Sequence, residues 1–153
     1  MWLSDDDFKA VIGNTPLISI DLIVRNANAE VLLGERQNRP AQGFWFVPGG
    51  RVRKNETLDD AFLRLTEEEL GLVIARQDAK WLGVYQHFYT DSVFGEGDDA
   101  PSTHYIVLAY EIDQLSQMEM TQNQQHHAFQ WWNEEKLLNS QDVHRYTKDY
   151  FRA

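Results

Sequence analysis

The sequence contains no cysteine among its 153 residues. This absence excludes a disulfide framework, a thiolate nucleophile and a zinc site built on cysteine ligands. Any metal or acid–base chemistry must therefore come from the five histidines and the 24 aspartates and glutamates.

Long apolar runs are also missing, and no stretch approaches the length that spans a bilayer. The first residues, MWLSDDDFKAVIG, lack the basic region, the apolar run and the small-residue cleavage site of a secretory signal. We therefore expect a soluble, cytoplasmic protein with no membrane partner.

Positive charge is scarce, because 14 lysines and arginines against 24 acidic residues give a formal net charge of -10. Binding to a nucleic-acid polymer depends mainly on lysine and arginine contacts with phosphates, so this balance argues against such a partner. Six of the 14 basic residues nevertheless lie close together in the chain: Arg36, Arg39, Arg51, Arg53, Lys54 and Arg64. Their clustering favours a local cationic site for a small phosphorylated ligand.

The pattern of the chain predicts one α+β domain over residues 1–153. Stretches rich in β-branched and aromatic residues predict strands at 17–26, 30–36, 44–47, 80–91, 103–112 and 126–132. The first two are expected to form a hairpin or neighbouring strands, and Pro48 to Gly50 a turn that uses the freedom of glycine in φ. Alternation in the first strand puts Ser19 and Asp21 on one face, so Asp21 is expected to face solvent or a site.

Three helices are predicted from their end signals. A short one follows Ser4 as its cap, and a terminal one follows Ser140. The third covers residues 58–70, with Thr57 as its N-cap and Gly71 suited to the left-handed residue after the last turn.

Three consecutive glutamates end the helix predicted at 58–70. Helical periodicity points Glu67 to solvent, brings Glu68 beside Arg64, and places Glu69 within the apolar stripe. A desolvated and unpaired carboxylate is costly. Glu69 therefore either has a cation as its partner or extends out of the core as part of a solvated face.

The same segment resembles the Nudix box, G-x5-E-x7-R-E-U-x-E-E-x-G-U, in which U is a bulky apolar residue. Seven of its nine specified positions match over 23 residues: Gly50, Glu56, Arg64, Glu68, Glu69, Gly71 and Leu72. Leu65 stands where the family has its first glutamate after the arginine, and Thr66 stands at the apolar position. The resemblance implies the Nudix fold, a mixed β-sheet sandwiched between α-helices, and Mg²⁺-dependent hydrolysis of a nucleoside diphosphate joined to another group.

The resemblance narrows to the GDP-mannose mannosyl hydrolases, a Nudix family in which leucine replaces that box glutamate. The segments that carry it are NRPAQGFWFVPGGR, QHFYTD, THYIVL and a late QH before an aromatic strand. It implies a nucleotide sugar as substrate, GDP-mannose with GDP-glucose as a further candidate. Water would attack the sugar C1 with inversion and release GDP, and the protein would be a homodimer.

The family resemblance also implies the metal site. Losing one glutamate removes a hard oxygen ligand and favours a single Mg²⁺, or Mn²⁺ in its place. The implied ligands are Glu69, the backbone carbonyl of Gly49 and the side-chain oxygen of Gln125. Glu68 is retained, so a second ion stays open.

His126 matches the general base of the family, and an imidazole with a pKa near neutrality suits that role. The alternatives are His127 as the base, or a surface histidine in a polar loop. Arg36 and Tyr105 match residues that contact the leaving diphosphate. Arg51 and Arg64 are expected to add positive charge or to brace the box.

For Arg64, an ion pair with Glu68 or Glu56 is the alternative to a catalytic role. Asp21 and His87 match residues near the sugar, where they would hydrogen-bond its hydroxyls or instead be satisfied strand residues. Phe8, Phe44 and Trp45 are candidates to stack on guanine, or else belong to the core.

Two other functions stay open. One is a diphosphatase that attacks phosphorus and gives GMP and a sugar 1-phosphate; Leu65 and the QH pair argue against it, and the retained Glu68 keeps it open. The other is a catalytically silent Nudix domain that binds a nucleotide sugar.

Overall fold

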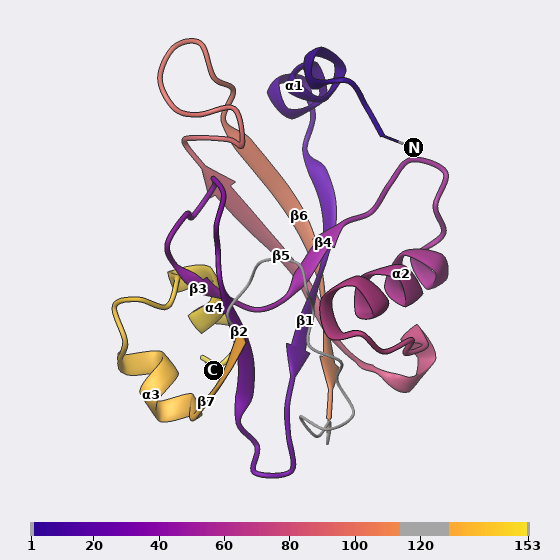
Figure 1. Cartoon of the computed structure of the whole chain (residues 1–153), viewed down its shortest axis with the longest axis vertical. Coiled ribbons are helices and arrows are strands. Elements are labelled where there is room, and N and C mark those ends of the chain that lie inside the picture. The colour runs from indigo at the N-terminus through magenta and orange to yellow at the C-terminus, as the bar shows by residue number, and fades with distance from the viewer. Residues whose placement is uncertain (1, 114–128, 153) are drawn as a thin grey trace.

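The computed structural model describes residues 2–113 and 129–152 (Figure 1). In chain order its elements are α1 (Asp5–Asn14), β1 (Leu17–Val24), β2 (Val31–Glu35), β3 (Trp45–Phe46), β4 (Gly49–Arg51), α2 (Leu58–Leu70), the 3-10 turn η1 (Arg76–Asp78), β5 (Lys80–Tyr89), β6 (Thr103–Ile112), β7 (Phe129–Trp132), α3 (Glu134–Asn139) and α4 (Arg145–Asp149). None of the described helices is long and apolar enough to cross a membrane.

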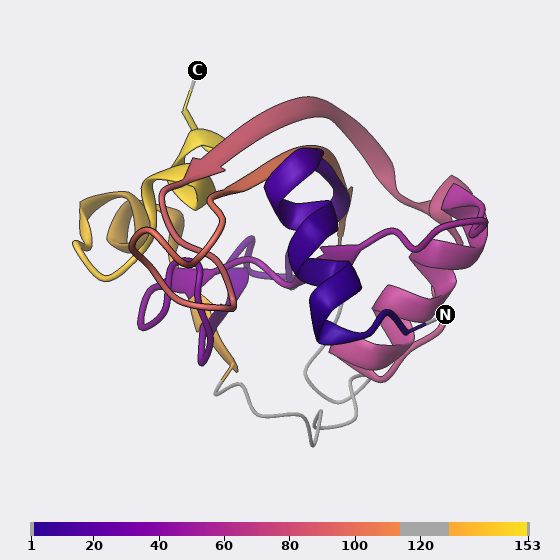
Figure 2. The ribbon, with the colours of Figure 1, turned by 90° about the horizontal axis from the view of Figure 1, so that it is seen from above.

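The strands form two sheets. The larger has the order β4-β1-β6-β5 and is mixed, because β1 runs parallel to β6 while the outer pairs are antiparallel. The smaller has the antiparallel order β3-β2-β7. Helix α2 lies on one side of the molecule and α3 and α4 lie on the other (Figures 1 and 2). The predicted α+β architecture of sheets between helices is confirmed.

Strand β1 is buried on both faces, and its alternation divides the core. Ile20, Leu22 and Val24 pack with α2 in one apolar cluster, whereas Ile23 belongs to the cluster with β2, β3, β7 and α3. The strand alternation places Asp21 on the face of Ile23, at a position only 8% exposed. A carboxylate therefore occupies a site where an apolar side chain would complete the core.

Helix α2 forms over the predicted residues. The Thr57 hydroxyl accepts a hydrogen bond from the Asp60 N–H at 3.0 Å, and Gly71 has the left-handed φ of 72° that glycine favours. Helix α1 likewise begins at the predicted cap, since the Ser4 hydroxyl accepts from the Asp7 N–H at 3.2 Å. Local end signals determine both helices.

Of the two alternatives predicted for β1 and β2, the structure shows neighbouring strands and not a regular hairpin. They pair at the bridge between Arg25 and Val31 and then enter different sheets. The predicted glycine turn after Pro48 is wrong. The glycines after Pro48 form strand β4 and do not need a positive φ. Close approach requires them: a Cβ on Gly49 would lie 2.2 Å from the Ile20 carbonyl oxygen.

The predicted cap of the terminal helix is also wrong. Ser140 follows α3, a helix that the sequence analysis did not predict. Helix α4 begins later, after His144, whose Nδ1 accepts from the Tyr146 N–H at 3.1 Å. Between the two helices Val143 bridges to Trp45, which holds the chain extended before α4 can start.

Candidate active site

A pocket lies where the two sheets and the C-terminal end of α2 meet. Its lining includes seven residues that the sequence analysis selected: Asp21, Arg36, Gly49, Arg51, Glu69, His87 and Tyr105. They come from β1, β4, β5, β6, α2 and the segment that follows β2. The fold thus gathers residues separated by more than half of the chain into one cavity.

The pairing of β1 with β4 fixes the floor of the pocket. Asp21 lies opposite Gly49 in the antiparallel register. A Cβ on Gly49 would come within 2.8 Å of Asp21 Oδ1, so only glycine lets the carboxylate lie against the β4 backbone. The box glycines therefore make room for the acid of the neighbouring strand.

Leu65 occupies the box position of a glutamate and belongs to the core. It is 2% exposed, and a Cβ on Gly50 would be 2.5 Å from its Cδ2. The leucine thus packs over the backbone of β4, where it supplies an apolar wall instead of a ligand.

Two carboxyl groups of the pocket occupy positions that disfavour their ionised forms. The pKa of Glu69 is raised to about 7, mainly by burial and also by the charges of Glu68 and Asp21, while the charge of Arg36 opposes the shift. Burial also raises the pKa of Asp21 to about 6, against a hydrogen bond from Tyr150 and the charge of Arg36. Both groups line the pocket together with Gly49 and carry hard oxygens, which is the donor chemistry that Mg²⁺ prefers.

The oxygen-bearing residues of the pocket fit a divalent cation that takes only some of its ligands from carboxylates. Within residues 2–113 and 129–152, no three histidine, aspartate or glutamate side chains gather closely enough to hold a metal ion by themselves. Mg²⁺ commonly uses one or two carboxylates and completes its octahedron with water and substrate phosphates. Glu69, the box glutamate that lines the pocket, meets that description.

Arginine side chains supply the positive charge of the pocket. Arg36 is held by a hydrogen bond from its Nε to the Pro40 carbonyl oxygen at 2.9 Å, and its guanidinium lies 5.9 Å from the centre of the Phe46 ring. The guanidinium of Arg51 lies 4.9 Å from the centre of the Phe8 ring. Guanidinium groups stay charged even when burial lowers their pKa, as it does for Arg51, so both can bind an anion.

Arg64 is absent from the pocket lining and braces the box loop. Its guanidinium donates to both oxygens of Glu56, at 2.7 and 2.9 Å, to Glu68 at 3.2 Å and to the Arg51 carbonyl oxygen at 2.9 Å. The hydrogen bond from Arg64 holds the pKa of Glu56 at about 2. The predicted pair with Glu68 is thus present, and Arg64 connects α2 to the strand that carries Arg51.

Strands β5 and β6 contribute His87 and Tyr105, which lie opposite each other in the register. His87 is 4% exposed, and burial together with the charge of His144 lowers its pKa to about 4. Burial raises the pKa of Tyr105. At neutral pH the pair therefore presents an uncharged imidazole and a protonated phenol.

The sequence analysis missed Tyr89, which lines the pocket, and the residues of α4 that surround His87. Tyr146 stacks on the His87 ring with centroids 4.3 Å apart and an interplanar angle of 5°. Tyr150 donates a hydrogen bond to Asp21. Tyr146 and Tyr150 are four residues apart, which is a helical spacing, but no local signal shows which strand a terminal helix will contact.

The remaining predicted residues lie elsewhere. Phe8 flanks Arg51, whereas Phe44 and Trp45 lie outside the pocket lining, against His144 and Trp132 respectively. Glu68 is also outside the lining. Gln125, His126 and His127 lie outside the described residues.

Comparison with known proteins gives the family. A family model described as NUDIX domain matches residues 15–152. The chain is 47% identical over 110 residues to the low-salt glycan biosynthesis protein Agl8 of Haloferax volcanii, covering 72% of this chain and 67% of that protein. It is 32% identical over 109 residues to an ADP-ribose pyrophosphatase of Methanocaldococcus jannaschii, covering 61% of this chain and 63% of the relative.

Solved structures share the fold. The crystal structure of a MutT protein from Methanosarcina mazei superposes with a TM-score of 0.68 at 22% identity and covers 90% of this chain and 92% of the other. The NUDIX domain of Shewanella oneidensis NrtR in complex with ADP ribose has a TM-score of 0.63 at 18% identity, covering 98% and 97%. At these identities the likeness concerns the fold alone.

Proposed function

Because this chain belongs to the Nudix family and is a Nudix hydrolase, we propose that it hydrolyses GDP-mannose to GDP and free mannose in a Mg²⁺-dependent reaction. Water attacks the sugar C1 with inversion, and the bond between C1 and the diphosphate oxygen breaks. GDP-glucose is a second candidate substrate. The 47% identical relative, named for glycan biosynthesis, supports the class of nucleotide sugars.

One observation carries the proposal: the pocket combines positively charged side chains with uncharged, hydrogen-bonding ones. Arg36 and Arg51 supply the charge, and His87 and Tyr105 supply neutral donors and acceptors. A nucleoside diphosphate joined to a neutral sugar has the same two parts. Arginine suits the diphosphate because its planar fork can contact two oxygens at once.

Leu65 supports attack at carbon. With an apolar side chain packed on Gly50, Glu69 is the only one of the box glutamates in the described part of the chain that lines the pocket. Diphosphate hydrolysis at phosphorus commonly relies on several metal ligands to activate water. A pocket with one box glutamate is better suited to stabilising a leaving group than to building a metal-bound nucleophile.

Glu69 and the Gly49 carbonyl would hold the Mg²⁺, with Gln125 as a further ligand and Glu68 as the candidate for a second ion. When bound, the cation supplies charge neutralisation to the diphosphate as GDP departs. Arg36 and Arg51 add to that neutralisation and orient the diphosphate. Tyr105 would donate its phenolic hydrogen to the same group.

His126 would accept the proton of the attacking water, with His127 as the alternative base. General-base catalysis of this kind contributes roughly 10²–10⁴-fold. The base must act from the side of C1 opposite to the diphosphate, because inversion requires it. Asp21 and His87 would meet the sugar hydroxyls and hold C1 between the base and the leaving group.

A second candidate function is a diphosphatase that attacks phosphorus and gives GMP and a sugar 1-phosphate. The 32% identical relative named ADP-ribose pyrophosphatase supports it. Glu68 beside Arg64 is a further carboxylate within one helical turn of the pocket. Both functions would use Arg36 and Arg51 to bind the diphosphate.

Product analysis distinguishes the two functions. The protein is incubated with GDP-mannose, with and without Mg²⁺, and nucleotides are separated by anion exchange. The proposal expects GDP and free mannose, whose first-formed anomer is β by NMR, and no turnover after chelation. GMP with mannose 1-phosphate would contradict attack at carbon and support the diphosphatase.

A further inference from the structure

We propose that Tyr150 is a positioning residue that joins Asp21 and His87 into one hydrogen-bonded unit and fixes the tautomer of His87. Tyr150 follows the last residue of α4. Its ring packs edge-to-face with the Tyr85 ring, and the two ring centroids are 4.7 Å apart. Its hydroxyl donates to Asp21 Oδ2 and lies 3.5 Å from His87 Nε2. One phenolic group thus touches two residues of the pocket.

The number of hydrogens decides the direction of both contacts. A phenolic hydroxyl has one hydrogen, and an ionised carboxylate can only accept. Tyr150 therefore donates to Asp21 and presents its lone pairs to His87. A neutral imidazole can satisfy that arrangement only by carrying its hydrogen on Nε2, which leaves Nδ1 as an acceptor.

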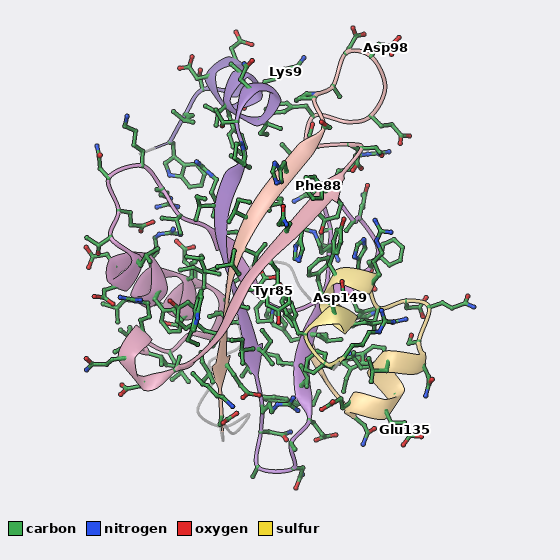
Figure 3. All side chains as sticks on the ribbon, turned by 180° about the vertical axis from the view of Figure 1, so that it is seen from behind. Lys9, Tyr85, Phe88, Asp98, Glu135 and Asp149 are labelled. Carbon is green, nitrogen blue, oxygen red and sulfur yellow. The ribbon has the colours of Figure 1, made fainter. Side chains whose placement is uncertain are left out.

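A second tyrosine, Tyr146 within α4, fixes the plane of the imidazole. Tyr146 stacks in parallel on the His87 ring, and its own hydroxyl accepts from the Phe88 N–H at 3.0 Å and donates to the Phe88 carbonyl oxygen at 2.9 Å. Figure 3 shows α4, marked by Asp149, lying beside β5, marked by Tyr85 and Phe88. The helix therefore holds the strand and orients the ring that the strand carries.

The unit has a consequence for the substrate, and this step rests on the proposed function. Asp21 and Nδ1 of His87 are both acceptors, so a sugar hydroxyl that meets either one must donate. A substrate with such hydroxyls can donate to both acceptors, whereas a substrate without them forgoes both hydrogen bonds. Tyr150 thereby contributes to the choice of a hydroxylated substrate.

The test compares Tyr150→Phe with Tyr85→Phe, which removes a hydroxyl from the neighbouring ring of the same aromatic cluster. The tautomer of His87 is measured without substrate by long-range ¹H–¹⁵N NMR of the imidazole at neutral pH. Wild type and Tyr85→Phe are expected to show the Nε2–H form. Tyr150→Phe is expected to lose that preference, and an unchanged His87 spectrum would overturn the proposal.

A second variant keeps the test independent of any packing defect. Asp21→Asn replaces an acceptor by a group that also donates, so the Tyr150 hydroxyl can turn toward His87, and we again expect loss of the Nε2–H preference. In kinetics, Tyr150→Phe should lower kcat at least about tenfold and change KM less than about twofold, because Arg36 and Arg51, which would bind the diphosphate, are unchanged. Failure of the wild type to hydrolyse GDP-mannose would refute the proposed function, whereas the NMR result decides the role of Tyr150 by itself.

Discussion

Replacing Glu69 with glutamine should stabilise the metal-free protein, because it removes a negative charge from a partly buried position in the last turn of α2. The carboxyl group has an ordinary pKa of 4.5, and its pKa in the folded protein is about 7. Because the folded-state pKa is raised, the folded state loses stability relative to the unfolded chain as pH rises from 4.5 through 7. At about pH 8 this loss amounts to about 3 kcal/mol.

The glutamine amide is itself costly to bury, by about 1–2 kcal/mol. The net gain for Glu69→Gln is therefore about 1–2 kcal/mol at about pH 8, which corresponds to an increase in Tm of about 2–8 °C. At about pH 5.5 the gain should be smaller, since much of the ionisation penalty has disappeared there. Glu67→Gln, on the exposed side of the same turn, is the matched control and should change little.

Mg²⁺ should reverse the order of the two proteins. A ligand at a hundred times its Kd stabilises the folded state by about 2.7 kcal/mol. The wild type and Glu67→Gln should gain this stability, and Glu69→Gln should not. Thermal unfolding is measured at both pH values, with chelator and with saturating Mg²⁺. The reasoning is refuted if Glu69→Gln is less stable than the wild type in chelator at the higher pH, or if it responds to Mg²⁺ as fully as Glu67→Gln does.

Three further predictions concern the residues around the pocket. Leu65→Glu puts a carboxylate into the core and should cost about 3 kcal/mol or more by urea unfolding, whereas Leu65→Met should cost less than about 1.5 kcal/mol; equal effects would contradict the packing argument. Arg64→Lys loses the paired hydrogen bonds to the two oxygens of Glu56 and should lower the free energy of unfolding by about 2 kcal/mol at neutral pH. Because the pKa of Glu56 is depressed from 4.5 to about 2, that cost should shrink as pH falls through this range, and a pH-independent cost would count against the ion pair. The pKa of His87 falls from 6.5 to about 4, so wild-type stability should decline by about 3 kcal/mol from this residue as pH falls between those values. His87→Phe should show a shallower decline, and parallel pH profiles would sink the assignment.

Local sequence signals were enough to predict the structure of the segment that carries the Nudix box. Helix α2 has the predicted bounds because its cap, its apolar stripe and its final glycine all agree. The exposure of Glu67 and the pairing of Glu68 with Arg64 followed from helical spacing alone. Strand alternation left two alternatives for Asp21, solvent or a site, and the structure places it in the pocket.

Contacts between distant segments could not be predicted in this way. Glycine is required at position 49 because the backbone of β1 approaches closely there. Rules for local turns do not describe such a contact between distant strands. The separation of β1 and β2 into two sheets, and the contact of α4 with β5, depend on packing across the whole domain. The tyrosine that bonds Asp21 therefore could not be selected from its own neighbours in the chain. The bound metal, the homodimer and the cytoplasmic location stay predictions.

The destination of oxygen from water tests the central claim most directly. The protein is incubated with GDP-mannose and Mg²⁺ in ¹⁸O-labelled water, and both products are analysed by mass spectrometry. Attack at carbon predicts label on free mannose and unlabelled GDP. Label on a phosphate oxygen, with GMP among the products, would contradict the account and assign the pocket to hydrolysis at phosphorus.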